Sequence, residues 1–255
     1  MPPPDFAPVA ASLHARLTAW FERRPGGVPT GGTTIATNSS ALEARGRPLL
    51  ALMAGREVPD LTGQRLLDLG CGFGALATYF AWNGASVVGV DRNSGSLVVG
   101  ADVAAEHGLD VELRRGAMER LDVPPASFDV AVMNNTLCYL LTEAERQAAL
   151  GGALQALRPG GLLVLRDLNG LHPVDQFTRL PLLGLLPPAR AVRVAARFGV
   201  PGRPAVRLLP PWRMARDLRR AGFADVRLEA DRPGGAARLV RPVARYQHLT
   251  ALRPR

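Results

Sequence analysis

From residue 65 onward, short apolar runs alternate with stretches whose apolar residues recur at helical spacing. Five of the short runs are predicted as strands: RLLDLG (65–70), SVVGVD (86–91), VELRRG (111–116), FDVAVMN (128–134) and GLLVLRD (161–167). Helices are predicted between them. Because the strands are apolar on both faces and alternate with helices, the pattern predicts a doubly wound, mainly parallel α/β sheet.

Sequence signals also mark the helix ends. Ser94 is expected to cap the helix that ends before Gly108. Thr142 and Glu145 form a capping-box pattern that opens a helix through Leu157. Further along, residues 212–223 predict another helix, and residues 224–230 and 245–253 predict the last two strands.

Residues 1–59 lie outside this alternation and predict an N-terminal helical extension to a domain at 60–255. An amphipathic helix is expected from Phe6 to Arg24, closed by Pro-Gly-Gly. A flexible polar loop, GGTTIATNSS (31–40), is expected next, either covering the cofactor or serving as a plain linker, and a second helix over residues 41–55 follows.

Composition predicts a cytoplasmic, reduced protein. The N-terminus MPPPDF has no charged segment followed by an apolar core, so no signal peptide is expected. Pro, Gly or charge breaks every apolar run well short of the ~20 residues that a membrane span needs. Two cysteines, Cys71 and Cys138, are too few for a disulfide framework.

Charge is distributed unevenly along the chain, whose formal net charge is +9. Residues 1–170 contain 14 arginines and 17 acidic residues, whereas residues 171–255 contain 17 arginines and five acidic residues. The basic C-terminal third is either a solvated face or a surface that meets an anionic partner.

The segment LLDLGCGFG (66–74) ends a strand and opens a helix. Its glycines allow a sharp turn and a close approach of a ligand to the backbone. The spacing is GxGxG rather than the GxGxxG of dinucleotide sites. Asp68 precedes the first glycine and would repel a pyrophosphate, so a cationic ligand is favoured. Asp91, at the end of the next strand, is positioned to bind both hydroxyls of a ribose.

With these residues the chain resembles the class I S-adenosylmethionine (SAM)-dependent methyltransferases over about residues 60–170. The resemblance rests on LLDLGCGFG, on VVGVD (87–91), on SFDVAVMNNTLCYL (127–140) and on LRPGGLLVL (157–165), in the family's order. It implies a Rossmann-like, seven-stranded and mainly parallel sheet whose last strand is antiparallel. It also implies SAM as cofactor and S-adenosylhomocysteine as product.

Carried over to this sequence, the resemblance implies a set of cofactor contacts. Asp68, Gly70, Cys71 and Gly72 would hold the methionine part, Asp91 the ribose, and Arg92 would lie beside the adenine. The loop Gly116, Ala117, Met118 and Glu119 would flank the adenine edge, and the backbone of Asn134 would contact the amino-acid end. The family often has Asp where this chain has Ala117. Glu119, a backbone carbonyl or a water would then take that hydrogen bond.

The methyl acceptor is expected beyond the carboxyl ends of the strands. Candidate polar residues there are Asn135, Tyr139, Asp167, Asn169 and His172. Of these, His172, Tyr139 and Asp167 are predicted as catalytic: His172 as a general base, or else a loop histidine, and Tyr139 as a channel residue, or else a packed one. Asp167 and Asn169 could instead join Asn134 around Mg²⁺, but the spacing is loose and no metal is predicted.

Residues 171–210, between the fifth strand and the next helix, are predicted to form a helical lid over the acceptor. The stretch RLPLLGLLPPARAVRVAARFG (179–199) puts Arg190, Arg193 and Arg197 at helical spacing beside a dense run of leucines. Such a segment buries its leucines against the domain, a ligand or a bilayer. A hydrophobic acceptor under the lid, a peripheral contact with an anionic membrane and a packed helix with a wet arginine face all remain open.

These features predict transfer of a methyl group to an oxygen or carbon atom of a small hydrophobic acceptor that is lipid-like, isoprenoid or polyketide-like. An RNA-modifying methyltransferase and a catalytically silent SAM-binding protein are the alternatives. Only charge favours RNA: aromatic residues are 5% of the chain, the NPPY-type pattern is replaced by NNTL, and no nucleic-acid partner is expected.

Overall fold

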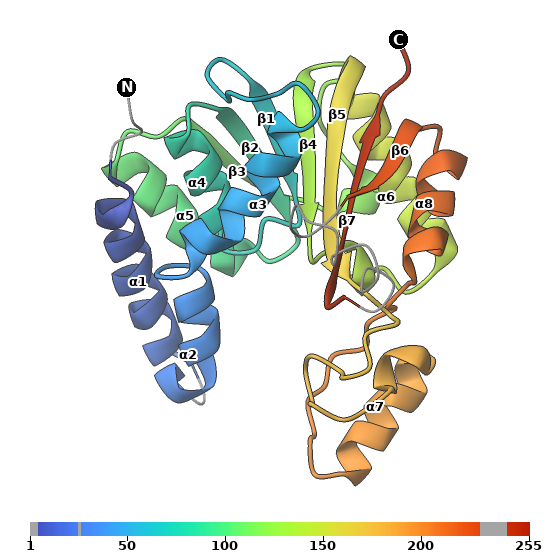
Figure 1. The fold of residues 1–255 in the computed structure, drawn as a ribbon. Coiled ribbons are helices and arrows are strands. Elements are labelled where there is room, and N and C mark those ends of the chain that lie inside the picture. Colours follow the sequence, from blue (N-terminus) through green and yellow to red (C-terminus); the bar gives the residue numbers. More distant parts are fainter. Residues whose placement is uncertain (1–4, 25–26, 230–243) are drawn as a thin grey trace.

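The computed structural model describes residues 5–24, 27–229 and 244–255, which fold around one seven-stranded sheet (Figure 1). The strand order is β3-β2-β1-β4-β5-β7-β6. Only β7 runs antiparallel to its neighbours, β5 and β6. The bounds are β1 Arg65–Leu69, β2 Ser86–Asp91, β3 Val111–Arg115, β4 Phe128–Asn134, β5 Leu157–Leu168, β6 Ala224–Glu229 and β7 Tyr246–Leu252. The predicted doubly wound sheet with an antiparallel last strand is confirmed.

Helices cover both faces of this sheet. One face packs against α1 (Ala7–Glu22), α3 (Leu42–Ala54), α4 (Ala75–Trp82) and α5 (Ser94–Glu106), in a core that includes Leu66, Val132 and Val164. The other face packs against α6 (Glu143–Ala156) and α8 (Pro211–Arg220), in a core that includes Leu67, Met133 and Leu165. Neighbouring residues of the central strands β1, β4 and β5 therefore enter different cores, as the two-sided apolar pattern requires.

The predicted polar loop at residues 31–40 is wrong, because most of it lies in helix α2 (Gly27–Thr37). Two side chains in and just after α2 donate to the backbone carbonyl four residues earlier. Thr37 Oγ1 donates to Thr33 O at 2.6 Å, and Ser39 Oγ donates to Ile35 O at 2.6 Å. The Ile35 side chain is buried. Packing of this kind overrides the weak helix propensity of Gly and Thr. Residues 25 and 26, predicted to close the first helix, lie outside the described residues.

One of the two predicted helix caps is confirmed. In α6, Glu145 N donates to Thr142 Oγ1 at 3.2 Å and Thr142 N donates to Glu145 Oε2 at 2.9 Å, which completes the capping box. In α5 the cap is Asn93 rather than Ser94, since Asn93 Oδ1 accepts from Gly95 N at 3.2 Å. Asn is as good a cap as Ser, so the helix starts one residue earlier than predicted.

A buried arginine joins the N-terminal helices to the last two strands. Arg56, two residues beyond α3, has a side chain that is 3% exposed. Its guanidinium donates to Asp225 Oδ2 at 2.9 Å and to Thr250 Oγ1 at 3.2 Å. The extension is therefore part of the domain rather than an appendage.

Residues 171–206 form a lobe that projects from the carboxyl edge of the sheet and carries η3 (Leu183–Leu185) and α7 (Pro188–Arg197) (Figure 1). An ion pair lies inside the lobe: Arg203 donates to Asp175 Oδ2 at 2.7 and 3.1 Å, with both side chains at most 1% exposed. Asp175 Oδ1 also accepts from Thr178 N and Thr178 Oγ1. None of the described helices has the length and apolar content that crossing a bilayer requires.

Candidate active site

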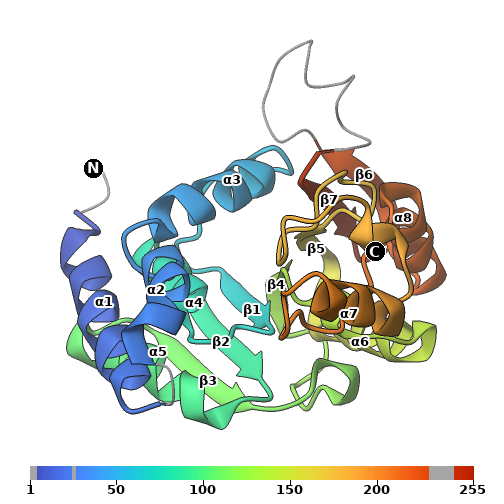
Figure 2. The same ribbon diagram turned by 90° about the horizontal axis from the view of Figure 1, so that it is seen from below.

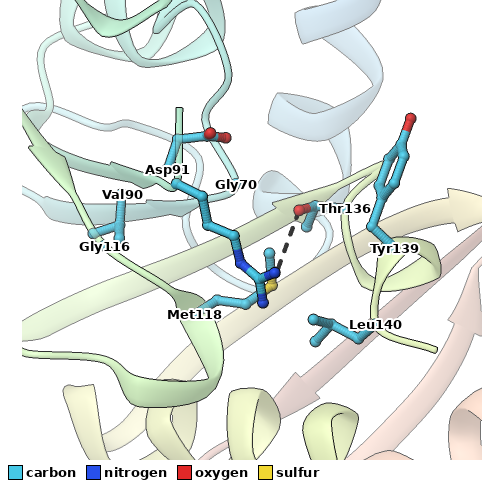
Figure 3. A pocket seen from close by; sticks show the side chains of 9 residues that line it. Gly70, Val90, Asp91, Gly116, Met118, Thr136, Tyr139 and Leu140 are labelled. Atoms are coloured by element: carbon cyan, nitrogen blue, oxygen red, sulfur yellow. Dashed lines mark hydrogen bonds between the residues drawn. The ribbon is translucent and has the colours of Figure 1, made fainter. Parts of the chain in front are cut away.

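A pocket of about 340 Å³ opens at the carboxyl edge of the parallel strands (Figure 3). Figure 2 looks at this edge, with α2 and α3 on one side of β1 and α7 on the other. β2 ends at the pocket with Asp91, Gly70 and Gly116 directly follow β1 and β3, and Thr136 comes two residues after the end of β4. The lining residues are Gly70, Val90, Asp91, Arg92, Gly116, Met118, Thr136, Tyr139 and Leu140. Ligand sites of open α/β sheets occupy this position.

The glycine turn after β1 lies against the carboxylate of Asp91, whose two oxygens accept backbone hydrogen bonds. Gly72 N donates to Asp91 Oδ2 at 2.9 Å, while Asn93 N donates to Asp91 Oδ1 at 2.9 Å. The Asp91 carboxylate is thus fixed by two backbone N–H groups, and each oxygen keeps a further lone pair for a ligand. Gly70 and Gly72 have φ values of +75° and +59°, the left-handed region that glycine enters at little cost.

Substitution of Gly70 by Ala is expected to destabilise the protein by about 2–3 kcal/mol. An added Cβ would overlap the Thr136 side chain, and alanine would also be strained at this φ. Chemical denaturation measures the loss. G70A/T136G, which removes the overlapping side chain, should regain part of it. Wild-type stability in G70A would show that the turn relaxes freely.

Asp68 is a buried carboxylate next to this turn. The residue is 2% exposed, and its Oδ2 has no hydrogen-bond partner among the described residues. Burial raises the pKa of Asp68 to about 7, the charge of Arg45 lowers it, and the charge of Asp91 raises it further. A dry carboxylate that lacks a donor is a site prepared for a cationic hydrogen-bond donor.

Arg45, from α3, supplies the opposite charge in the same region. Its guanidinium donates to Thr37 O at 3.1 Å and Asn38 Oδ1 at 2.9 Å, while Nε has no partner among the described residues. Burial lowers the pKa of Arg45 to about 10, and the charge of Arg166 lowers it further. The N-terminal extension therefore brings a desolvated cation to the sheet edge.

Arg92 and Glu119 form an ion pair at the mouth of the pocket. The hydrogen bond from Arg92 lowers the pKa of Glu119. The other oxygen, Glu119 Oε2, is buried and lacks a partner among the described residues. Beside it, Met118 is buried and its sulfur accepts from Thr136 Oγ1 at 3.9 Å (Figure 3). Ala117 precedes Met118 in an extended conformation and contributes no polar side chain.

The remaining predicted cofactor residues surround the turn without lining the pocket. Burial raises the pKa of Cys71 far above its usual value, so the thiol stays protonated. Asn134, 9% exposed, accepts from Arg166 Nη1 at 3.2 Å through Oδ1. Of the ten predicted cofactor residues, four line the pocket: Gly70, Asp91, Arg92 and Met118.

The three residues predicted as catalytic lie in different environments. Tyr139 lines the pocket and is 51% exposed. Burial raises the pKa of its hydroxyl, with the charges of Cys138 and Asp167 adding to the effect. Asp167 is 1% exposed and accepts from Cys138 N at 2.9 Å and Leu168 N at 2.7 Å, so it fixes the backbone of η2 (Leu137–Tyr139). His172 Nδ1 contacts Val174 O at 2.6 Å within the lobe.

Neither the lid nor a metal site is visible in this pocket. None of residues 171–210 lines it, so their role as an acceptor lid stays a prediction. In the described parts of the chain, no three His, Cys, Asp or Glu side chains gather to hold a metal ion.

Sequence reasoning missed four residues at the site. Val90, Thr136 and Leu140 line the pocket, and Arg45 approaches Asp68. Thr136 lies within a motif that was recognised, and its contact with Gly70 becomes evident only in three dimensions. Arg45 carries no local signal, because the packing of α3 decides where its side chain lies.

Comparison with known proteins identifies the domain that contains this pocket. Residues 66–161 match a family model described as "Methyltransferase domain". A ubiquinone biosynthesis O-methyltransferase of Azorhizobium caulinodans is 34% identical over 114 residues, which is 45% of this chain and 44% of that protein. Its namesake from Nitrosococcus oceani is 36% identical over 115 residues, 45% of this chain and 48% of that protein. The chain thus matches less than half the length of these curated relatives.

Solved structures share the fold. An S-adenosylmethionine-dependent methyltransferase from Mesorhizobium loti has a TM-score of 0.60 at 23% identity, covering 81% of this chain and 98% of that one. The [4+2]-cyclase SpnF has a TM-score of 0.56 at 24% identity, covering 81% and 80%. The motif order, the strand order and the domain match agree: residues 66–161 match a methyltransferase domain, and the chain has the fold of the S-adenosylmethionine-dependent methyltransferases.

Proposed function

We propose that this protein transfers the methyl group of SAM to an oxygen atom of a small apolar acceptor. The observation that carries the proposal is the pair of aspartates at the glycine turn. Asp91 is fixed by two backbone donors, and Asp68 has a buried oxygen without a donor. A ligand that brings both a ribose diol and an ammonium group would satisfy them together.

The described residues fit SAM at each of its polar groups. Asp91 would accept from the ribose hydroxyls, as acidic residues at this strand end do. Asp68 and Arg45, opposite in charge, would bind the ammonium and carboxylate of the amino-acid end. Glu119 Oε2, buried without a donor, would accept from the adenine amino group. It would take the role of the Asp that the family often has at the position of Ala117.

SAM supplies an activated methyl on its sulfonium, so the protein has to align the acceptor and exclude water. Thr136, Tyr139 and Leu140 line the pocket on the side of β4 and would form the acceptor wall. With its raised pKa, Tyr139 keeps its proton at neutral pH and would act as a hydrogen-bond donor rather than a base. His172, which lies outside this wall, remains the candidate base.

The relatives favour oxygen over carbon as the methylated atom. Both are named as O-methyltransferases of ubiquinone biosynthesis. A lipid-like or isoprenoid acceptor carrying a hydroxyl group is consistent with those names and with the apolar lining of the pocket. The second candidate is a protein that binds SAM without transferring its methyl group, because SpnF, which has the same fold, is named as a cyclase.

Asp91→Ala is expected to weaken SAM binding by roughly a hundredfold, since it removes two charge-assisted hydrogen bonds. Isothermal titration with SAM and S-adenosylhomocysteine measures the change. The matched control is Asp102→Ala: Asp102 is an exposed acid on α5 that pairs with Arg16. Unchanged binding in D91A, or no binding in the wild type, would remove the cofactor assignment.

Methyl transfer itself is tested with methyl-tritiated SAM and a panel of phenols that carry apolar chains of increasing length, alongside bulk RNA. We expect label in the organic phase, with kcat/KM rising as the chain lengthens. Label in RNA would instead support the RNA-modifying alternative. SAM binding without transfer to any member would support a silent SAM-binding protein.

A further inference from the structure

We propose that the lobe of residues 171–206 docks on an anionic phospholipid bilayer. The lobe places large apolar side chains in solvent: Leu182 is 55% exposed, Leu185 58% and Phe198 66%. Leu185 comes just before α7, and Phe198 directly follows it. Apolar side chains gathered on one projecting element mark an interaction surface.

The backbone holds one of these leucines in an uncommon conformation. Leu182 has φ +58°, and a branched residue in this left-handed region is an outlier. The conformation keeps an apolar side chain exposed where glycine would fit without strain. Conformations of this kind persist where the surrounding structure enforces them, and they cluster at functional surfaces.

Positive charge accompanies the exposed apolar side chains. Arg190, Arg193 and Arg197 recur along one face of α7, and all three are exposed. None of them forms an ion pair with a described residue. Asp175, the one acidic residue between 171 and 210, is buried and paired with Arg203. The exposed charged side chains of the lobe are therefore all positive.

An anionic bilayer fits both features, since its headgroups attract arginine and its interior accepts Leu and Phe. A second copy of the chain fits less well, because a two-fold contact would place the same arginines opposite each other. RNA fits less well too: bases stack on aromatic side chains, and of the three exposed apolar residues only Phe198 is aromatic. The proposal concerns the lobe and does not depend on methyl transfer.

The test is flotation of the full-length protein with two sets of vesicles, one of phosphatidylcholine alone and one with three parts in ten phosphatidylglycerol. At low salt we expect binding only to the second set. R190Q/R193Q/R197Q should lower the partition coefficient by about a hundredfold, and 0.5 M salt should have a similar effect.

The matched control is R213Q/R216Q/R219Q on α8, a helix of ten residues like α7 in which these three arginines are also exposed. It removes the same charge and should bind vesicles as the wild type does. Equal losses in both variants, no flotation at low salt, or flotation that ignores lipid charge would overturn the proposal. Arginine-dependent binding to RNA without flotation would assign the lobe to RNA.

Leu182→Gly separates the apolar contribution from charge. Glycine suits the backbone conformation, so thermal stability should stay close to that of the wild type. Vesicle binding should fall severalfold, because the exposed side chain is gone. Full binding in L182G together with L185S and F198S would show that the leucines and phenylalanine do not insert.

Discussion

Arg203→Met is expected to destabilise the lobe by about 3–5 kcal/mol, because it leaves the Asp175 carboxylate buried without its partner. Burial raises the pKa of Asp175, but the hydrogen bond and charge of Arg203 more than offset this and hold it below its usual value. Hydrogen exchange of residues 171–206 should become fast in R203M. SAM affinity should stay within about twofold, because no lobe residue lines the pocket.

The double variant D175N/R203M removes both charges and should recover most of the lost protection, since a pair replaced by neutral groups is far less costly than a pair that is broken. Lobe protection in R203M equal to the wild type would show that Asp175 finds another cation. Loss of SAM binding in R203M would show that the lobe closes on the pocket after all.

Asp68→Asn is expected to stabilise the ligand-free protein by about 4 kcal/mol at pH 8, by less than about 2 kcal/mol at pH 5 and by little below pH 4. The folded pKa of Asp68, about 7, lies above the unfolded value of 3.8. Its contribution to stability is therefore fully present below pH 4 and is lost as pH rises through 7. Denaturation of both proteins across this range measures the difference, and a constant difference would contradict the raised pKa.

The same carboxylate makes SAM affinity depend on pH. Pairing with the SAM ammonium favours ionised Asp68, so binding releases a proton and affinity should rise about 20-fold from pH 5.5 to 7.5. Above that range the ammonium itself begins to titrate, near 7.7–8.0. D68N should show no such slope.

Asp167 provides the control for this pH dependence. Burial raises its pKa to about 6, yet its two oxygens are occupied by backbone donors away from the pocket. D167N should therefore change the pH dependence of stability without changing that of SAM affinity. A change in the affinity slope would place Asp167 in the cofactor site.

The sheet and the glycine turn were predictable because they depend on local pattern. Alternating apolar runs set the strands, and the positive φ values of Gly70 and Gly72 follow from the sharp turn that their spacing requires. Residues 31–40 were not predictable. Their composition is that of a loop, and the helix arises from contacts that only tertiary packing provides, such as the burial of Ile35.

The sequence indicates which charged residues belong to the site but not their pKa values. Asp68 and Asp91 could be assigned from their places at strand ends. The pKa of Asp68 could not, because it depends on burial and on Arg45, which lies 23 positions earlier in the chain on helix α3. In the same way, the lobe was predictable as an insertion, whereas the direction in which it projects is set by contacts outside it.

The long-range hydrogen bonds of Arg56 affect the order in which the chain can fold during synthesis. Its partners, Asp225 and Thr250, lie 169 and 194 positions later. On the ribosome, the N-terminal helices emerge first but cannot complete their bonding until the last strands follow. Such long-range closure slows folding and leaves the early helices with an unpaired guanidinium while synthesis continues. The ends of this chain are thus synthesised farthest apart in time and finish folding together.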